Sequence, residues 1–226
     1  MRNKTKRDIM VRDKYHNQLI QLQEKISSLS ELVKNAIKES IISLQDHNVE
    51  QAVDVIKDDI KIDEISTQIE IDCMRLLALQ QPLARDLRLI VAIIKINIDL
   101  ERTGDLAVAI AKVTVAIDNE IHIKPLVDIP RMATVVCKMI DGAQRAFCES
   151  DSDLAYDIAI FDNEVDALYN QVWREIMTLM IENPHNIRNA SQLTLIARNL
   201  ERMGDHVSNM CESIVYMVTG KRVKLN

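Results

Sequence analysis

The feature that most constrains the fold is an internal repeat. The heptapeptide DLERTGD at residues 99–105 recurs as NLERMGD at residues 199–205, a shift of one hundred positions. A second match, in the same order along the chain, relates Asp59 and Asp63 to Asp162 and Asp166 at a shift of 103. Two matches in the same order indicate that one structural unit is present twice.

The composition favours helices for this unit. Only four glycines and four prolines occur in 226 residues, and aromatic residues make up 3%, whereas sheets would require more turn and aromatic residues. Hydrophobic residues at 47% are enough for a sizeable core. We therefore predict an all-α protein made of two tandem three-helix bundles, residues 1–120 and 121–226.

Apolar residues that recur every three or four positions mark a long first helix. These residues are Leu19, Leu22, Ile26, Leu29, Val33, Ile37, Ile41 and Leu44. The helix is expected to end near residues 46–48. The pattern then predicts helices over residues 50–79 and 86–117, a link at 118–130, helices over 131–148 and about 152–181, and a last helix after Pro184. All four prolines are thereby placed between helices.

Several classes of protein are disfavoured. A net charge of -6 does not suit nucleic-acid binding. The longest apolar run is broken by Lys95, so no membrane span is expected. Residues 1–15 are basic without a following apolar segment, which predicts a frayed end and no secretory signal. The cysteines show no paired spacing and are expected to be reduced thiols, as in the cytoplasm: Cys73, Cys137, Cys148 and Cys211.

The repeated acids fall at matching heights of neighbouring helices. Residues four apart share a helix face, so Glu101 lies above Asp105, and Asp59 above Asp63. If the second and third helices turn near Leu83, these two pairs lie within roughly 3 Å of the same height. The second half repeats the arrangement with Asp162, Asp166, Glu201 and Asp205.

Both acids of the third helix continue a seam with 4-3-4-3-4 spacing. In the first half the seam is mostly apolar, comprising Leu87, Val91, Ile94, Ile98, Glu101 and Asp105. The equivalent seam of the last helix is mostly polar, comprising Ile187, Ser191, Thr194, Arg198, Glu201 and Asp205. This difference suggests an open groove in the second half, and the two sites need not be alike.

Four converging acids repel one another and are expected either to keep raised pKa values or to bind cations. Ligands that are all oxygen suit hard cations such as Mg²⁺, Ca²⁺ or Mn²⁺. The alternative is a solvated acidic face with basic partners such as Lys61, Arg102 and Arg202.

Other residues near the acids carry weaker signals. Gly104 and Gly204 lie inside predicted helices, where glycine is unfavourable, and are expected to allow close approach of a helix or ligand. His206 points a quarter-turn away from Asp205, which favours a flanking role over direct ligation. Asn209 continues the ladder from Glu201 and is the candidate for an additional neutral ligand.

Residues 81–88 (QPLARDLR), 99–105 and 199–209 resemble the signature segments of the PhoU family of phosphate-signalling proteins, and the resemblance spans nearly the whole chain. It implies a non-enzymatic negative regulator of the bacterial phosphate-starvation response, which links the ATPase subunit of the phosphate ABC transporter to a phosphate-sensing histidine kinase.

The resemblance also implies multinuclear metal sites, with iron, zinc, magnesium or manganese, on the eight repeated acids. The family usually has Asn where this chain has Ala109, so the first site is expected to lack a ligand or to bind more weakly. The Gln81-Pro82 segment has no clear counterpart in the second half, where Asn183-Pro184-His185 stands instead.

Two other functions were weighed. A di-metal carboxylate enzyme of ferritin-like type needs Glu-x-x-His motifs projecting into a bundle, and the only local match, Glu182 to His185, straddles a proline. A plain helical scaffold without metal would leave the acids as surface groups. A homodimer through an apolar helix face is also expected, although the sequence does not identify the face.

Overall fold

The computed structural model describes residues 2–118 and 122–225, with side chains from residue 15 onward, and these residues form helices without any strand. The elements are α1 (Arg2–Gln45), α2 (Val49–Gln80), α3 (Ala84–Ile117), α4 (Asp128–Glu149), α5 (Ser152–Ala159), α6 (Asp162–Glu182), the 3₁₀ helix η1 (Pro184–Asn186) and α7 (Ile187–Thr219). The all-α prediction is confirmed. The proposed division between residues 120 and 121 lies outside the described residues, as do the side chains of the basic N-terminal segment.

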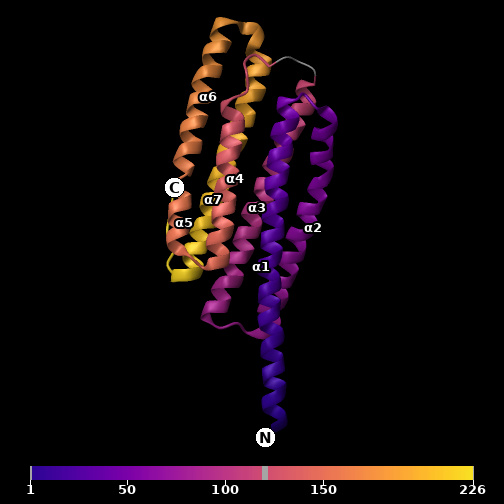
Figure 1. The fold of residues 1–226 in the computed structure, drawn as a ribbon, viewed down its shortest axis with the longest axis vertical. Helices are drawn as coiled ribbons and strands as arrows, with labels where there is room; N and C mark the ends of the chain where they lie inside the picture. Colours follow the sequence, from indigo (N-terminus) through magenta and orange to yellow (C-terminus); the bar gives the residue numbers. More distant parts are fainter. Residues whose placement is uncertain (1, 119–121, 226) are drawn as a thin grey trace.

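The helices form two units that share one core. Helices α1, α2 and α3 pack together, and α4, α6 and α7 pack together with the short α5, while α2 and α6 lie at the two flanks (Figure 1). The most extensive packing between any two helices joins α3 to α7, across the two halves. Most buried apolar side chains of both halves accordingly form one continuous cluster, beside a small separate one of Ala52, Val55 and Ala111.

Two contacts show that α3 and α7 run antiparallel. The Arg88 Nε donates to the Met217 carbonyl oxygen at 3.2 Å, and the His206 Nδ1 lies 3.0 Å from the Asp99 Oδ1. Asp99 follows Arg88 by eleven residues, and His206 precedes Met217 by eleven, so the two pairs share one register. In that register the acid-bearing segments 101–105 and 201–205 lie at the same height of the molecule.

The predicted apolar stripe of α1 is confirmed, because all eight of its residues are at most 5% exposed. Local chemistry then sets the helix ends. The Asn48 side chain accepts from the Gln51 amide at the start of α2, and Asp151 accepts from the Asp153 and Leu154 amides at the start of α5. Gln81 adopts a left-handed conformation after α2, and the following Pro82 prevents continuation.

The structure corrects two sequence predictions. The single helix predicted over residues 152–181 is broken at Ile160 and Phe161, where the amides of Asn163 and Glu164 donate to carbonyls three residues back instead of four. Pro184 separates α6 from α7 and opens η1, as predicted, but Pro130 lies in the first turn of α4 instead of between helices. A proline is tolerated there because the first amides of a helix have no partner within it.

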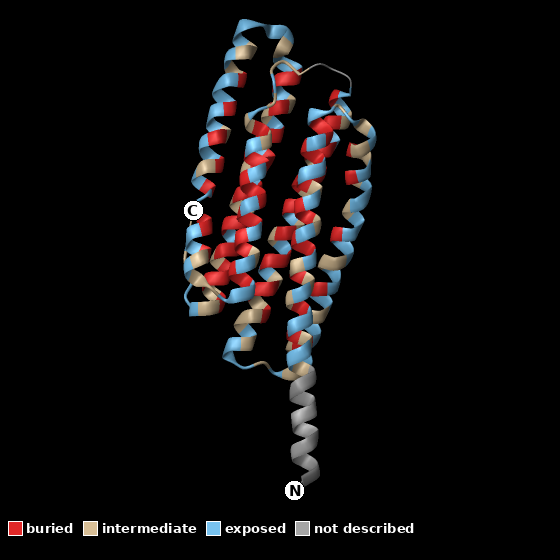
Figure 2. Ribbon diagram, in the orientation of Figure 1, coloured by how far each residue is buried: buried red, intermediate tan, exposed pale blue. Residues whose placement is uncertain are grey.

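The surface pattern agrees with a bundle whose core lies between the helices (Figure 2). Cys73, Cys137 and Cys211 are free and buried, and burial raises the pKa of Cys73 and Cys211 to about 12 and of Cys137 to about 11. Cys148 is free and exposed. Among the described residues, none of the helices has the length and apolar character that crossing a bilayer requires.

Shortening a side chain in the shared core should be far more costly than shortening one on the outer seam. Leu100 on α3 is fully buried, so Leu100→Ala should lower the free energy of unfolding by about 2–5 kcal/mol. Ile98, two residues earlier, is 52% exposed, and Ile98→Ala should change it by less than about 1 kcal/mol. Urea unfolding measures both variants. Equal losses would contradict the assignment of the core.

Candidate functional site

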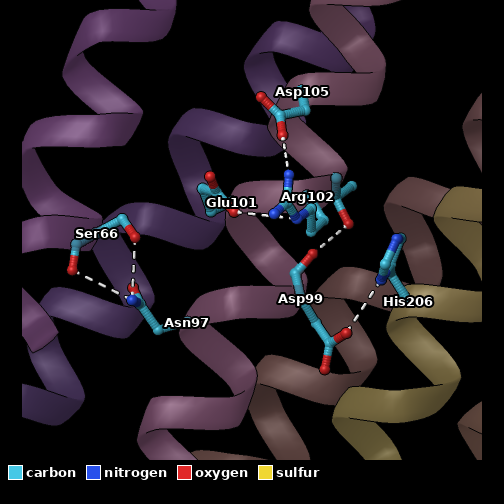
Figure 3. A network of polar contacts seen from close by, with 8 residues as sticks. Ser66, Asn97, Asp99, Glu101, Arg102, Asp105 and His206 are labelled. Atoms are coloured by element: carbon cyan, nitrogen blue, oxygen red, sulfur yellow. Dashed lines mark hydrogen bonds and ion pairs between the residues drawn. The ribbon is translucent and has the colours of Figure 1, made fainter.

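The first acid group lies between α2 and α3. Asp59 and Asp63 come from α2, and Glu101 and Asp105 come from α3. The Asn97 Nδ2 donates to the carbonyl oxygen of Ser66 at 3.2 Å and to its Oγ at 3.0 Å, which places Asn97 level with Ser66 (Figure 3). A turn centred on Leu83 predicted residue 69 at that level. The true register brings Asp63 level with residue 100 and Asp59 level with residue 104, so the acids match more closely than predicted.

The electrostatics of this group reflect that proximity. Burial, followed by Asp63 and Asp105, raises the pKa of Asp59. Burial, followed by Asp105 and then by Asp63 and Asp59, raises the pKa of Glu101, although Arg102 opposes the shift. The Asp59 Oδ1 is buried without a hydrogen-bond partner among the described residues. A cation at this position would relieve both the repulsion and the unsatisfied oxygen.

Basic neighbours partly neutralise the first group. The Arg102 Nη1 lies 3.1 Å from the Asp105 Oδ2, and its Nε lies 3.7 Å from the Glu101 Oε2 (Figure 3). Lys61 pairs with Asp58 instead of the group, at 2.8 Å. Of the basic partners expected for a solvated acidic face, Arg102 therefore contacts the group, whereas Lys61 does not.

The second acid group lies between α6 and α7. Asp162 is the first residue of α6 and is buried, whereas Asp166 one turn later is exposed. Burial followed by Asp205 raises the pKa of Asp166, and burial followed by Asp205, Asp166 and Asp162 raises the pKa of Glu201, against an opposing effect of Arg198. The helix break before Asp162 places its carboxylate at the positive end of the α6 dipole, a position that Asp59 lacks in the middle of α2.

The two repeated glycines allow close contacts, as predicted. A Cβ at Gly204 would lie 2.4 Å from the Asp162 Oδ1, and a Cβ at Gly104 would lie 3.1 Å from the Ile62 Cδ1. Gly204 thus lets an acid of α6 approach the backbone of α7. Gly104 serves helix packing.

One contact that sequence reasoning missed joins the two halves beside the acids. Asp99 precedes Glu101 by two residues, and its partner His206 follows Asp205 directly, so the pair links the two acid-bearing segments (Figure 3). The only sequence signal was that Asp99 belongs to the repeated heptapeptide. Asn209, the predicted additional ligand, is exposed one turn beyond Asp205.

The two acid groups bring oxygen ligands together but do not form a preassembled metal site. Among the described residues, no three His, Cys, Asp or Glu side chains stand close enough together to hold a metal ion in their present positions. The donor set is nevertheless all oxygen and lies on facing helices, and oxygen is the ligand type that hard cations prefer. The ferritin-like motif is not supported, because Glu182 and His185 are exposed at the end of α6 and in η1.

Comparisons with known proteins agree with the repeat. A family model described as the PhoU domain matches residues 26–114 and 129–214, one segment in each half. The chain is 39% identical to a phosphate-specific transport system accessory protein PhoU homolog of Aquifex aeolicus, over 93% of this chain and 96% of that protein. A protein of the same description from Clostridium acetobutylicum is 34% identical over 96% of this chain and 100% of its own length.

A solved structure shows the same fold. The crystal structure of PhoU from Pseudomonas aeruginosa superposes with a TM-score of 0.87 at 33% identity, and the match covers 92% of this chain and 100% of that one.

Removing one acid from each group should stabilise the metal-free protein at neutral pH. The folded-state pKa values of Glu101 and Glu201 lie above the ordinary value of 4.5, so folding favours their protonated forms. That stabilisation is complete below the unfolded-state pKa and is lost as the pH rises through the folded-state pKa. Glu101→Gln with Glu201→Gln should therefore raise the melting temperature at pH 7 in chelator and have little effect at about pH 3.5.

The exposed Glu149 provides the control. Glu149→Gln should shift the melting temperature little at either pH. A double variant that melts at or below the wild-type temperature at pH 7 would contradict the repulsion inferred for the two groups.

Proposed function

Because the chain belongs to the PhoU family, we propose that it is an accessory regulator of phosphate transport that represses the phosphate-starvation response when phosphate is plentiful. The observation that carries the proposal is the match of both halves to the PhoU domain, together with relatives named as accessory proteins of the phosphate-specific transport system over nearly their full length.

The proposed mode of action is that of an adaptor without catalytic activity. One surface would contact the ATPase subunit of the phosphate ABC transporter, and another a phosphate-sensing histidine kinase, both on the cytoplasmic side of the membrane. Long helices with exposed outer faces suit such docking, and neither acid group pairs a Ser or Cys nucleophile with a base for covalent catalysis. A homodimer is part of this proposal.

We further propose that both acid groups hold metal ions, whether iron, zinc, magnesium or manganese. Asp59, Asp63, Glu101 and Asp105 would be the ligands in the first half. Asp162, Asp166, Glu201 and Asp205 would be the ligands in the second, with Asn209 as a possible addition. A bound cation would neutralise the repulsion between the acids and would tie α2 to α3 and α6 to α7.

Deleting the protein should abolish repression by phosphate. In a deletion strain grown with excess phosphate, a phosphate-starvation promoter should rise to its starved level, because the transporter no longer signals sufficiency to the kinase. Reporter activity from such a promoter measures the effect, and the wild-type chain supplied in trans should restore repression. Unchanged phosphate control in the deletion strain would refute the regulatory role.

Metal content should depend on the two acid groups. Protein purified without chelator or affinity tag should retain metal by elemental analysis, and a folded variant with Ala at Glu101, Asp105, Glu201 and Asp205 should lose it, because each group keeps only its two α2 or α6 acids.

A matched variant with Ala at four exposed acids outside the groups, Glu149, Asp153, Asp157 and Glu182, should retain the metal. Equal metal content in all three proteins would show that the ions bind elsewhere.

A further inference from the structure

A cavity of about 430 Å³ opens between α2 and α3, and its lining includes Asp63 and Glu70 from α2 and Ile94, Ile98 and Glu101 from α3. We refer to this cavity, together with the exposed side chains between it and the α2–α3 turn, as the α2–α3 groove. Figure 3 shows Ser66, Asn97 and Glu101 at this position. The cavity therefore combines acidic side chains with two apolar ones, of which Ile98 is exposed and Ile94 is half-buried.

The apolar part of the groove continues toward the α2–α3 turn. Leu87 and Ile98 on α3 are both exposed, and Met74, one turn beyond Glu70 on the same face of α2, is 58% exposed. From Leu87 to Ile98 the strip extends roughly 16 Å, about three helical turns. Side chains of this kind gain nothing from their exposure to water, so a contiguous strip of them suggests a binding surface.

The second half shows that the fold does not require an apolar strip. At the repeat-equivalent positions of Val91, Ile94 and Ile98, α7 carries Ser191, Thr194 and Arg198. The same helix pair in the same fold therefore accepts polar residues along this seam. The exposed Ile98 of the first half therefore needs a reason other than folding.

The charge around the groove indicates which charge a partner surface should carry. Helix α2 contains eight acidic residues and three basic ones, and each basic side chain is already paired within the helix: Lys57 with Asp54, Lys61 with Asp58 and Arg75 with Asp72. Asp63 and Glu70 on the rim thus add negative charge beside the apolar strip. A complementary surface would be apolar along about three turns and positive along its edge.

We propose that the α2–α3 groove is a docking site for a basic amphipathic helix of a partner protein, whose apolar face covers Leu87, Ile94 and Ile98 and whose Lys or Arg side chains reach Glu70 and, in the metal-free protein, Asp63. An amphipathic helix presents apolar residues at i, i+3, i+4 and i+7, which matches the spacing of the α3 strip. The inference rests on the chemistry of the groove and does not depend on the regulatory function proposed above.

A second copy of this chain fits the groove poorly. In a two-fold dimer the same patch meets itself, so the acids of each groove would face either the acids or the apolar strip of the other. Both arrangements would remove carboxylates from water without a positive partner, which is unfavourable. The net charge of -6 adds to the repulsion between copies.

The test uses the full-length protein in chelator and a synthetic helical peptide of about 18 residues, with Leu at the spacing of one helix face and Lys elsewhere. Binding is measured by fluorescence anisotropy of the labelled peptide. The wild type should bind it at low salt and more weakly as salt rises, and should not bind the same peptide with Glu in place of Lys.

The decisive variant is Val91→Ser with Ile94→Thr and Ile98→Arg, which copies the polar seam that α7 already carries. It should bind the Lys peptide at least tenfold more weakly while retaining its circular dichroism. Ile98→Arg alone replaces only an exposed side chain and should also weaken binding, at an unchanged melting temperature. A control with Ile181→Arg and Ile187→Thr removes exposed apolar residues from the second half and should bind like the wild type.

Two results would overturn the proposal. One is equal binding of the Lys peptide by the wild type and the seam variant, or no binding by the wild type at all. The other is a wild-type dimer that the seam variant converts to a monomer in analytical ultracentrifugation, because the occupant of the groove would then be a second copy.

Discussion

The antiparallel packing of α3 against α7 is the constraint on which the rest of the structure depends. Because the helices are repeat equivalents that cross in one register, their acid-bearing segments come to the same height. Each helix uses one side for this contact and another for its own flanking helix, α2 or α6. The acids are therefore held close to one another by the packing of buried apolar residues, to which the acids do not contribute.

That core keeps the acid groups in an unfavourable electrostatic state. Glu101 and Glu201 have raised pKa values on helices whose neighbouring residues, Leu100 and Leu200, are fully buried. Apolar burial over the long α3–α7 contact can outweigh repulsion among a few partly exposed carboxylates. Positive charge close to the acids therefore stabilises such a site. Arg102 supplies part of this positive charge in the first half, and Arg198 supplies part of it in the second.

The sequence predicted those features that depend on local periodicity. The apolar stripe from Leu19 to Leu44 identified α1 and its buried face, because a 3.6-residue period is a property of the helix alone. The break before Asp162 was missed, because the backbone there stays right-handed and only its hydrogen bonds tighten. The level of Asp63 was off by three residues, since a hairpin register depends on side-chain packing such as that of Asn97 on Ser66. The pairing of Asp99 with His206 could not be predicted, because it depends on how the two halves pack together and sequence periodicity does not reveal that packing.

The repeat itself separates what the fold requires from what it tolerates. Positions that are apolar and buried in both α3 and α7, such as Leu100 and Leu200, serve the shared core in either half. Other positions, such as Ile98 and Arg198, differ across the repeat while the backbone stays the same, so the shared core does not need an apolar residue there. Burial explains why the first kind is apolar, but it does not explain an isoleucine that is 52% exposed where its repeat equivalent is an arginine. An apolar side chain at such a position stays in contact with water after folding, which is unfavourable. A partner that covers this surface would remove the side chain from water.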